Sequence, residues 1–137
     1  MCVQVEVEVS ISPSSPLTFA VCEIEDRVLD GVAKACQKHV RVIDTFARLG
    51  GEEFAILLPE TDLSTAQNIA SRLLSYVAEL EFEQDDNSKS KPIAVTISLG
   101  LASLGRGDNS LSRVLSRADE ALYHAKEAGR NQIFPMS

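Results

Sequence analysis

The chain has few of the residues that metal centres, disulfide frameworks and nucleic-acid binding need. Its three cysteines are an odd number without a CxxC spacing, and neither of its two histidines has a second soft ligand nearby. We therefore expect reduced thiols in a cytosolic protein and no zinc site. With 13 basic against 20 acidic side chains, the net charge of −7 repels polyanions. No nucleic-acid polymer is expected as a partner.

Long apolar segments are lacking as well. No run approaches the ~20 residues needed to cross a bilayer, and the first residues have no basic region followed by an apolar block. We therefore expect neither membrane insertion nor a signal peptide, and a cytoplasmic location. The 137 residues, 45% hydrophobic and 24% charged, have the length and composition of one globular domain.

Hydrophobic periodicity predicts an α+β domain with helices packed on a mixed central β-sheet. Residues 3–11 alternate as a strand with one wet face, which is either a sheet edge that pairs between subunits or an added intramolecular strand. Loops are expected at residues 12–16, at 83–91 and around Gly105 and Gly107. The other predicted strands are 17–24, 45–49, 54–58, 93–101 and 131–134, and the predicted helices are 27–40, 61–80 and 111–125.

The most informative stretch joins two short predicted strands through Gly50 and Gly51, which are followed by Glu52 and Glu53. Glycine tolerates positive φ, which favours a hairpin, and it lets backbone N–H groups come close to a ligand. Adjacent carboxylates repel each other, and a hard divalent cation relieves that repulsion. The residues alone allow a solvated acidic turn or a cation site.

Separate motifs connect this hairpin to a known family. GGEEF stands at 50–54, an alternating apolar strand at 93–102, and ADEALYHAKEAGRN at 118–131. In this order the chain resembles the GGDEF family, the diguanylate cyclases of bacterial cyclic di-GMP signalling. The resemblance implies a nucleotidyl-cyclase-like GGDEF-type domain at 17–137, preceded at 1–16 by an unmatched strand and a Ser/Pro linker.

The resemblance implies that two GTP molecules, one on each subunit of an antiparallel homodimer, are joined into cyclic di-GMP with Mg²⁺ (or Mn²⁺) as cofactor. By motif, Glu52 would act at the 3′-hydroxyl and the metal, and Glu53 would bind the metal. Lys126 and Arg130, four residues apart at a helix end, would reach the terminal phosphates. A solvated basic helix end is the alternative for that pair. Gly50 and Gly51 would lie against the ligand.

A second site is implied by Arg41 and Asp44, which form an RxxD sequence five residues before the glycine pair. In the family this sequence binds cyclic di-GMP and mediates allosteric product inhibition. Arginine suits phosphate and guanine, and Asp44 would accept hydrogen bonds from the guanine edge. Arg72, on the next predicted helix, would contribute another arginine. The alternative is an exposed Arg–Asp pair of little energetic value.

The chain departs from the family after the predicted strand 17–24, which is taken as the first core strand. Glu23 stands where the family has a metal-binding aspartate, and the guanine-binding FK…NDxxGH segment before Arg27 is absent. Either the segment is deleted or the sequence omits it. We therefore expect a domain that binds cyclic di-GMP, with cyclase activity weak or lost. The alternatives are an active diguanylate cyclase and a degenerate dimerisation module.

Overall fold

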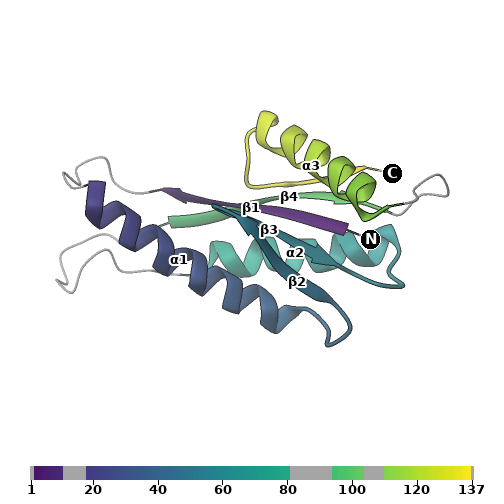
Figure 1. Cartoon of the computed structure of the whole chain (residues 1–137), viewed down its shortest axis with the longest axis horizontal. Helices are drawn as coiled ribbons and strands as arrows, with labels where there is room; N and C mark the ends of the chain where they lie inside the picture. The colour runs from purple at the N-terminus through teal and green to yellow at the C-terminus, as the bar shows by residue number, and fades with distance from the viewer. Residues whose placement is uncertain (1, 11–17, 81–93, 104–109, 137) are drawn as a thin grey trace.

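The computed structural model describes residues 2–10, 18–80, 94–103 and 110–136 (Figure 1). The loops predicted at 12–16, at 83–91 and around Gly105 and Gly107 lie outside the described residues. In chain order the elements are β1 (Cys2–Ser10), α1 (Thr18–His39), β2 (Thr45–Gly50), β3 (Glu53–Leu57), α2 (Leu63–Ala78), β4 (Ala94–Ala102), α3 (Leu111–Glu127) and β5 (Ile133–Met136). Among the described helices, none is long and apolar enough to span a membrane.

The strands form one mixed sheet in the order β2-β3-β1-β4-β5. β1 is antiparallel to both β3 and β4, β2 is antiparallel to β3, and β5 runs parallel to β4. The predicted α+β architecture is confirmed. Of the two alternatives for residues 3–11, the intramolecular strand is confirmed and the intersubunit sheet edge is wrong, because β1 pairs with β3 on one side and β4 on the other.

Helices cover both faces of this sheet. Figure 1 shows α3 on one face and α1 and α2 on the other. The main core packs buried residues of α1, α2, β3 and β4, and a smaller cluster joins Ala102 of β4 to Val114 and Ala118 of α3. Because side chains alternate along a strand, successive β4 residues lie on opposite faces of the sheet. Val95, Ile97 and Leu99 belong to the main core, whereas Gly100 lies against the α3 backbone.

The strand predicted at residues 17–24 is wrong, because α1 runs as one helix from Thr18 to His39. A short, continuous apolar run fits a buried strand and a buried helix equally well by periodicity. The helix predicted from residue 27 continues the same element. The central place in the sheet is taken by β1. Later in α1, burial raises the pKa of the Cys36 thiol to about 11, so this thiol is neutral, as expected of a core cysteine.

The helix α2 begins at a side-chain cap. Asp62 is extended and its Oδ1 accepts a hydrogen bond from the backbone N–H of Thr65 at 2.8 Å. Carboxylates favour this position because they satisfy a free N–H and oppose the positive end of the helix dipole. The backbone hydrogen bond from Thr65, followed by one from its side chain, lowers the pKa of Asp62.

We expect Asp62→Ala to lower the melting temperature at neutral pH. Because the folded pKa lies below the unfolded one, the cap stabilises fully above the unfolded pKa, and that contribution disappears as the pH falls through the folded pKa. The difference in melting temperature between Asp62→Ala and wild type should therefore shrink on acidification. Thermal unfolding followed by circular dichroism across acidic and neutral pH measures this. A constant difference would contradict the role of the charge.

Candidate functional site

The glycine pair closes the predicted hairpin between β2 and β3. Gly50 and Gly51 have φ values of 143° and 52°, which favour glycine. Arg48 braces the turn by donating from Nε and Nη2 to the carbonyl oxygen of Gly51, at 3.1 and 2.7 Å. The turn presents Glu52 exposed and Glu53 half-buried. The local sequence therefore places two carboxylates at one end of the sheet.

The strand register puts Glu53 in a row with residues of two further strands. Glu53 of β3 is opposite Glu6 of β1, and Glu6 is opposite Ser98 of β4. Directly opposite residues in antiparallel strands share a face of the sheet. Ser98 lies two residues before Gly100, so the row belongs to the face that α3 covers. Across β1, Glu53 is therefore in register with Ser98 on this face.

The C-terminal end of α3 meets the same row. Buried Ser98 accepts a hydrogen bond through Oγ from the backbone N–H of Asn131 at 3.0 Å. Gly129, Arg130 and Asn131 have positive φ values of 119°, 63° and 49°, so the chain turns sharply after the helix. Lys126, half-buried, belongs to the last turn of α3. The turn thus brings the C-terminal end of α3, which carries the predicted phosphate-binding residues, next to the row that contains Glu53 and Ser98.

The predicted metal ligands are distributed differently from the expectation. Glu23 lies in α1, not at the end of a sheet strand, and the acidic residue opposite Glu53 is Glu6. Within residues 2–10, 18–80, 94–103 and 110–136, no group of three or more His, Cys, Asp or Glu side chains is arranged to hold a metal ion. The carboxylate oxygens of Glu52 and Glu53 are nevertheless the donors that Mg²⁺ prefers.

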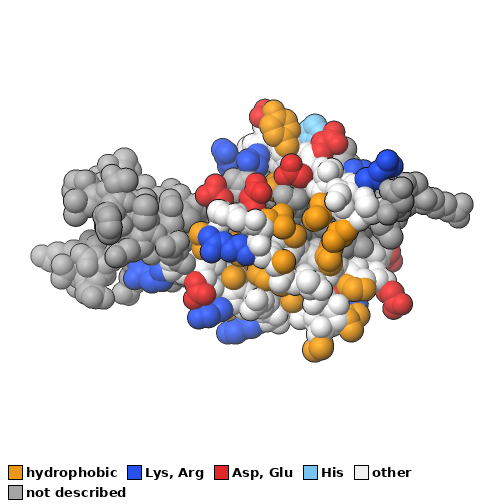
Figure 2. All heavy atoms as spheres, viewed as in Figure 1, with side chains coloured by type: hydrophobic (Ala, Val, Ile, Leu, Met, Phe, Trp, Pro, Cys, Tyr) orange, Lys and Arg blue, Asp and Glu red, His pale blue; other side chains and the backbone are white. Residues whose placement is uncertain are grey.

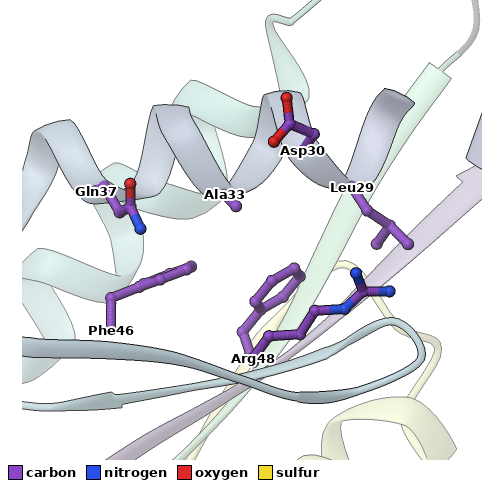
Figure 3. A pocket seen from close by; sticks show the side chains of 7 residues that line it. Leu29, Asp30, Ala33, Gln37, Phe46 and Arg48 are labelled. Carbon is purple, nitrogen blue, oxygen red and sulfur yellow. The ribbon is translucent and has the colours of Figure 1, made fainter. Parts of the chain in front are cut away.

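A pocket of about 400 Å³ lies between α1 and the β2–β3 hairpin. Figure 3 shows Gln37 pointing toward Phe46, Arg48 extending below Leu29, and Asp30 directed away from the strands. Phe46 and Phe54, which also line it, stack with ring centroids 5.4 Å apart. Aromatic walls beside an arginine suit a flat, polar-edged ring. The pocket is next to the hairpin because Arg48 belongs to both.

The Arg41 turn, residues 41–44, joins α1 to β2. The Nε of Arg41 donates to both carboxylate oxygens of Asp44 at 3.2 Å, and Nη2 donates to Oδ1 at 3.0 Å. The backbone N–H of Arg41 donates to Oδ2 at 2.6 Å. The Asp44 side chain is fully covered, whereas that of Arg41 remains 45% exposed. Asp44 is thus occupied by Arg41, and Arg41 still faces solvent.

Arg72 lies in a second pocket, the Arg72 pocket, of about 380 Å³ between α2 and the end of α1. His39 and Tyr76 line it too, with ring centroids 4.3 Å apart. His39 is only two residues before Arg41. The Arg72 pocket therefore borders the end of α1, from which the chain continues into the Arg41 turn.

Three further residues were not singled out by the sequence. Glu6 lies in a strand of alternating apolar and polar residues, and this pattern does not specify which strands pair with it. Ser98 lies within the strand predicted at 93–101, and Thr61, which bonds to Arg41, stands at the start of the helix predicted at 61–80. For Glu6, the one available sequence signal was a carboxylate within a valine-rich strand. On the face shown in Figure 2, acidic and basic side chains are interspersed over the described surface.

Comparisons with known proteins agree with this geometry. The family model "Diguanylate cyclase, GGDEF domain" matches residues 23–132. "Diguanylate cyclase A" of Treponema denticola is 41% identical over 108 residues, which cover 79% of this chain and 28% of the relative. The chain spans between 15% and 29% of the length of six curated relatives that it matches.

Solved structures share the fold. The active GGEEF domain of a diguanylate cyclase from Vibrio cholerae superposes with a TM-score of 0.79 at 27% identity, covering 99% of this chain and 81% of that one. The GGDEF domain of DgcB from Caulobacter crescentus, solved in complex with c-di-GMP, gives a TM-score of 0.76 at 25% identity. That match covers 98% of this chain and 76% of the DgcB domain.

Proposed function

Because the chain belongs to the GGDEF domain family of diguanylate cyclases, we propose that it binds cyclic di-GMP at the Arg41 turn and the Arg72 pocket. The observation that carries the proposal is the Arg41 guanidinium, which is held by Asp44 while its side chain is 45% exposed. A guanidinium already fixed in place loses little freedom when it binds phosphate. Cyclic di-GMP carries two anionic phosphodiesters, one for each arginine.

In this proposal Asp44 positions Arg41 instead of contacting guanine. Both of its oxygens accept hydrogen bonds from Arg41. A carboxylate with no exposed surface has no face left for a ligand unless the pair opens. Within the described residues, Nη1 of Arg41 makes no hydrogen bond, so this nitrogen remains for phosphate.

The location suits a regulatory site. The Arg41 turn precedes β2, and the hairpin with Glu52 follows its other end. A ligand at the Arg41 turn therefore lies one strand length from the carboxylates. The proposed consequence is allosteric product inhibition in an assembly that makes cyclic di-GMP. We further propose a cytoplasmic homodimer, because the family's reaction joins two GTP molecules held by two subunits.

Titration calorimetry with cyclic di-GMP tests the proposal. We expect saturable heat, together with a melting temperature that rises with ligand concentration because the ligand binds only the folded chain. If cyclic di-GMP produces no heat and no thermal shift, the proposed function is wrong. If GTP also has no effect and sedimentation shows a dimer, the dimerisation module is the remaining reading.

A diguanylate cyclase is the second candidate, favoured by the position of Glu53 in register with Ser98, which bonds to Asn131 next to Arg130. Glu52 and Glu53 would hold Mg²⁺, which when bound neutralises triphosphate charge. Lys126 and Arg130 would bind the terminal phosphates through charge-assisted hydrogen bonds. The residues that hold the guanine base in the family are missing, and an unread base edge weakens recognition. We therefore propose that turnover is weak or lost.

With GTP and Mg²⁺ at high protein concentration, we expect no more cyclic di-GMP from the wild-type chain than from Glu53→Ala. Anion-exchange chromatography of the nucleotides measures the product. The same assay with Mn²⁺ covers the alternative metal. Product that appears in the wild type and disappears in Glu53→Ala would make the cyclase the leading function.

A further inference from the structure

The Arg41 guanidinium is tied to a segment far along the chain as well as to its own turn. Nη2 donates to the carbonyl oxygen of Pro59 at 3.1 Å and to Oγ1 of Thr61 at 2.6 Å. These acceptors lie 18 and 20 residues away in sequence, on the connection between β3 and α2. The guanidinium therefore bridges two connections of the fold, and its orientation depends on both.

Thr61 is oriented for this contact by a bond of its own. Its hydroxyl donates to the carbonyl oxygen of Pro59 at 2.9 Å. A hydroxyl has one proton, so with that proton on Pro59 its lone pairs are left to accept from Arg41. Between the two residues, Glu60 has a positive φ of 51°, a conformation that non-glycine residues adopt only when the surroundings hold it.

Thr61 also connects the Arg41 turn to the helix that carries Arg72. The next residue, Asp62, is the cap of α2, and Arg72 is ten residues further along that helix. A displacement of Thr61 would therefore change the position of the Arg41 guanidinium. On the other side of Thr61, the Asp62 cap holds the start of α2.

We propose that Thr61 is a positioning residue of the cyclic di-GMP site, whose hydroxyl fixes the Arg41 guanidinium so that Nη1 is left to bind phosphate. This inference rests on the proposed function. Asp44 accepts hydrogen bonds from Nε and Nη2, and Nη2 is shared further with Thr61 and the Pro59 carbonyl, of which Thr61 makes the shorter bond. Thr61 therefore strengthens the contacts that stop the side chain from moving about its long aliphatic stem. Its loss would cost affinity by letting Arg41 move, without removing any group that touches the ligand.

Thr61→Val removes the hydroxyl and keeps the shape, whereas Thr61→Ser keeps the hydroxyl. We expect cyclic di-GMP affinity to fall about fivefold to tenfold in Thr61→Val, the range of one hydrogen bond, and to stay within about twofold of wild type in Thr61→Ser. Thr65→Val is the matched control, because Thr65 bonds to the Asp62 cap and not to Arg41. Titration calorimetry measures the affinities of all four proteins.

A ligand-free measurement separates this inference from the proposed function. Nitrogen-15 NMR of the Arg41 side chain should show slow rotation of the guanidinium in wild type and Thr61→Ser, and faster rotation in Thr61→Val. Equal affinity and equal rotation in Thr61→Val would overturn the positioning role. If the wild type takes up no cyclic di-GMP, the proposed function fails, and the NMR comparison still decides whether Thr61 fixes Arg41. A loss of affinity in Thr65→Val equal to that in Thr61→Val would assign the effect to the helix cap and overturn the inference.

Discussion

Arg41→Ala should weaken the binding of cyclic di-GMP by about a hundredfold or more, the largest functional effect that we expect of a single substitution. A hydrogen bond to a charged group contributes about 1.5 to 3 kcal/mol, and two such bonds to phosphate give about 3 kcal/mol or more. Each 1.4 kcal/mol corresponds to about a tenfold change in affinity. Titration calorimetry on folded wild type and variant measures the ratio.

Two variants control for charge and for the shape of the donor. Lys34→Ala removes one positive charge from α1, where Lys34 pairs with Asp30 at 2.9 Å on the exposed surface, and it should leave the affinity unchanged. Arg41→Lys keeps the charge without the planar fork and should bind with an intermediate affinity. An Arg41→Ala protein that binds as tightly as wild type would remove Arg41 from the site. If Lys34→Ala weakens the binding of cyclic di-GMP as much as Arg41→Ala does, the loss of affinity is explained by the change in net charge alone.

Gly100→Ala should destabilise the fold strongly, although it adds only one methyl group. A Cβ on Gly100 would lie 2.2 Å from the Leu122 nitrogen, 2.3 Å from the Ala118 oxygen and 2.8 Å from the Ala121 carbonyl carbon. All three atoms belong to the α3 backbone, so the helix itself must move away from β4. Overpacking of a core costs about 1 to 3 kcal/mol and occasionally more, and we expect about 3 kcal/mol for this substitution. Urea unfolding followed by circular dichroism measures the loss.

Gly51→Ala is the matched control, because it adds the same methyl group where nothing lies within 4 Å. Its cost should come only from the left-handed backbone, about 1 to 2 kcal/mol. A loss in Gly100→Ala no larger than in Gly51→Ala would show that α3 adjusts freely. In that case α3 would not hold Lys126 and Arg130 rigidly over the sheet.

Local patterns predicted the later part of the chain well. The β2–β3 hairpin, α2 with its start near Asp62, β4 and α3 lie within a few residues of their predicted bounds. Each carries a signal within its own residues, such as the glycine pair, the cap or a 3.6-residue repeat. The apolar run at 17–24 lacked such a signal. A continuous apolar run fits a buried strand and a buried helix equally well, so its local pattern does not distinguish the two.

Motifs and periodicities are local properties, and they were sufficient to predict the family, the hairpin with its carboxylates, the RxxD sequence and the class of fold. The tertiary structure decided the place of β1 in the middle of the sheet and the pairing of Glu6 with Glu53. It also decided the burial of Asp44 beneath Arg41 and the contact of Thr61 with that arginine. These arrangements join residues distant in sequence through backbone pairing and packing, and a one-residue change in register would have produced different neighbours.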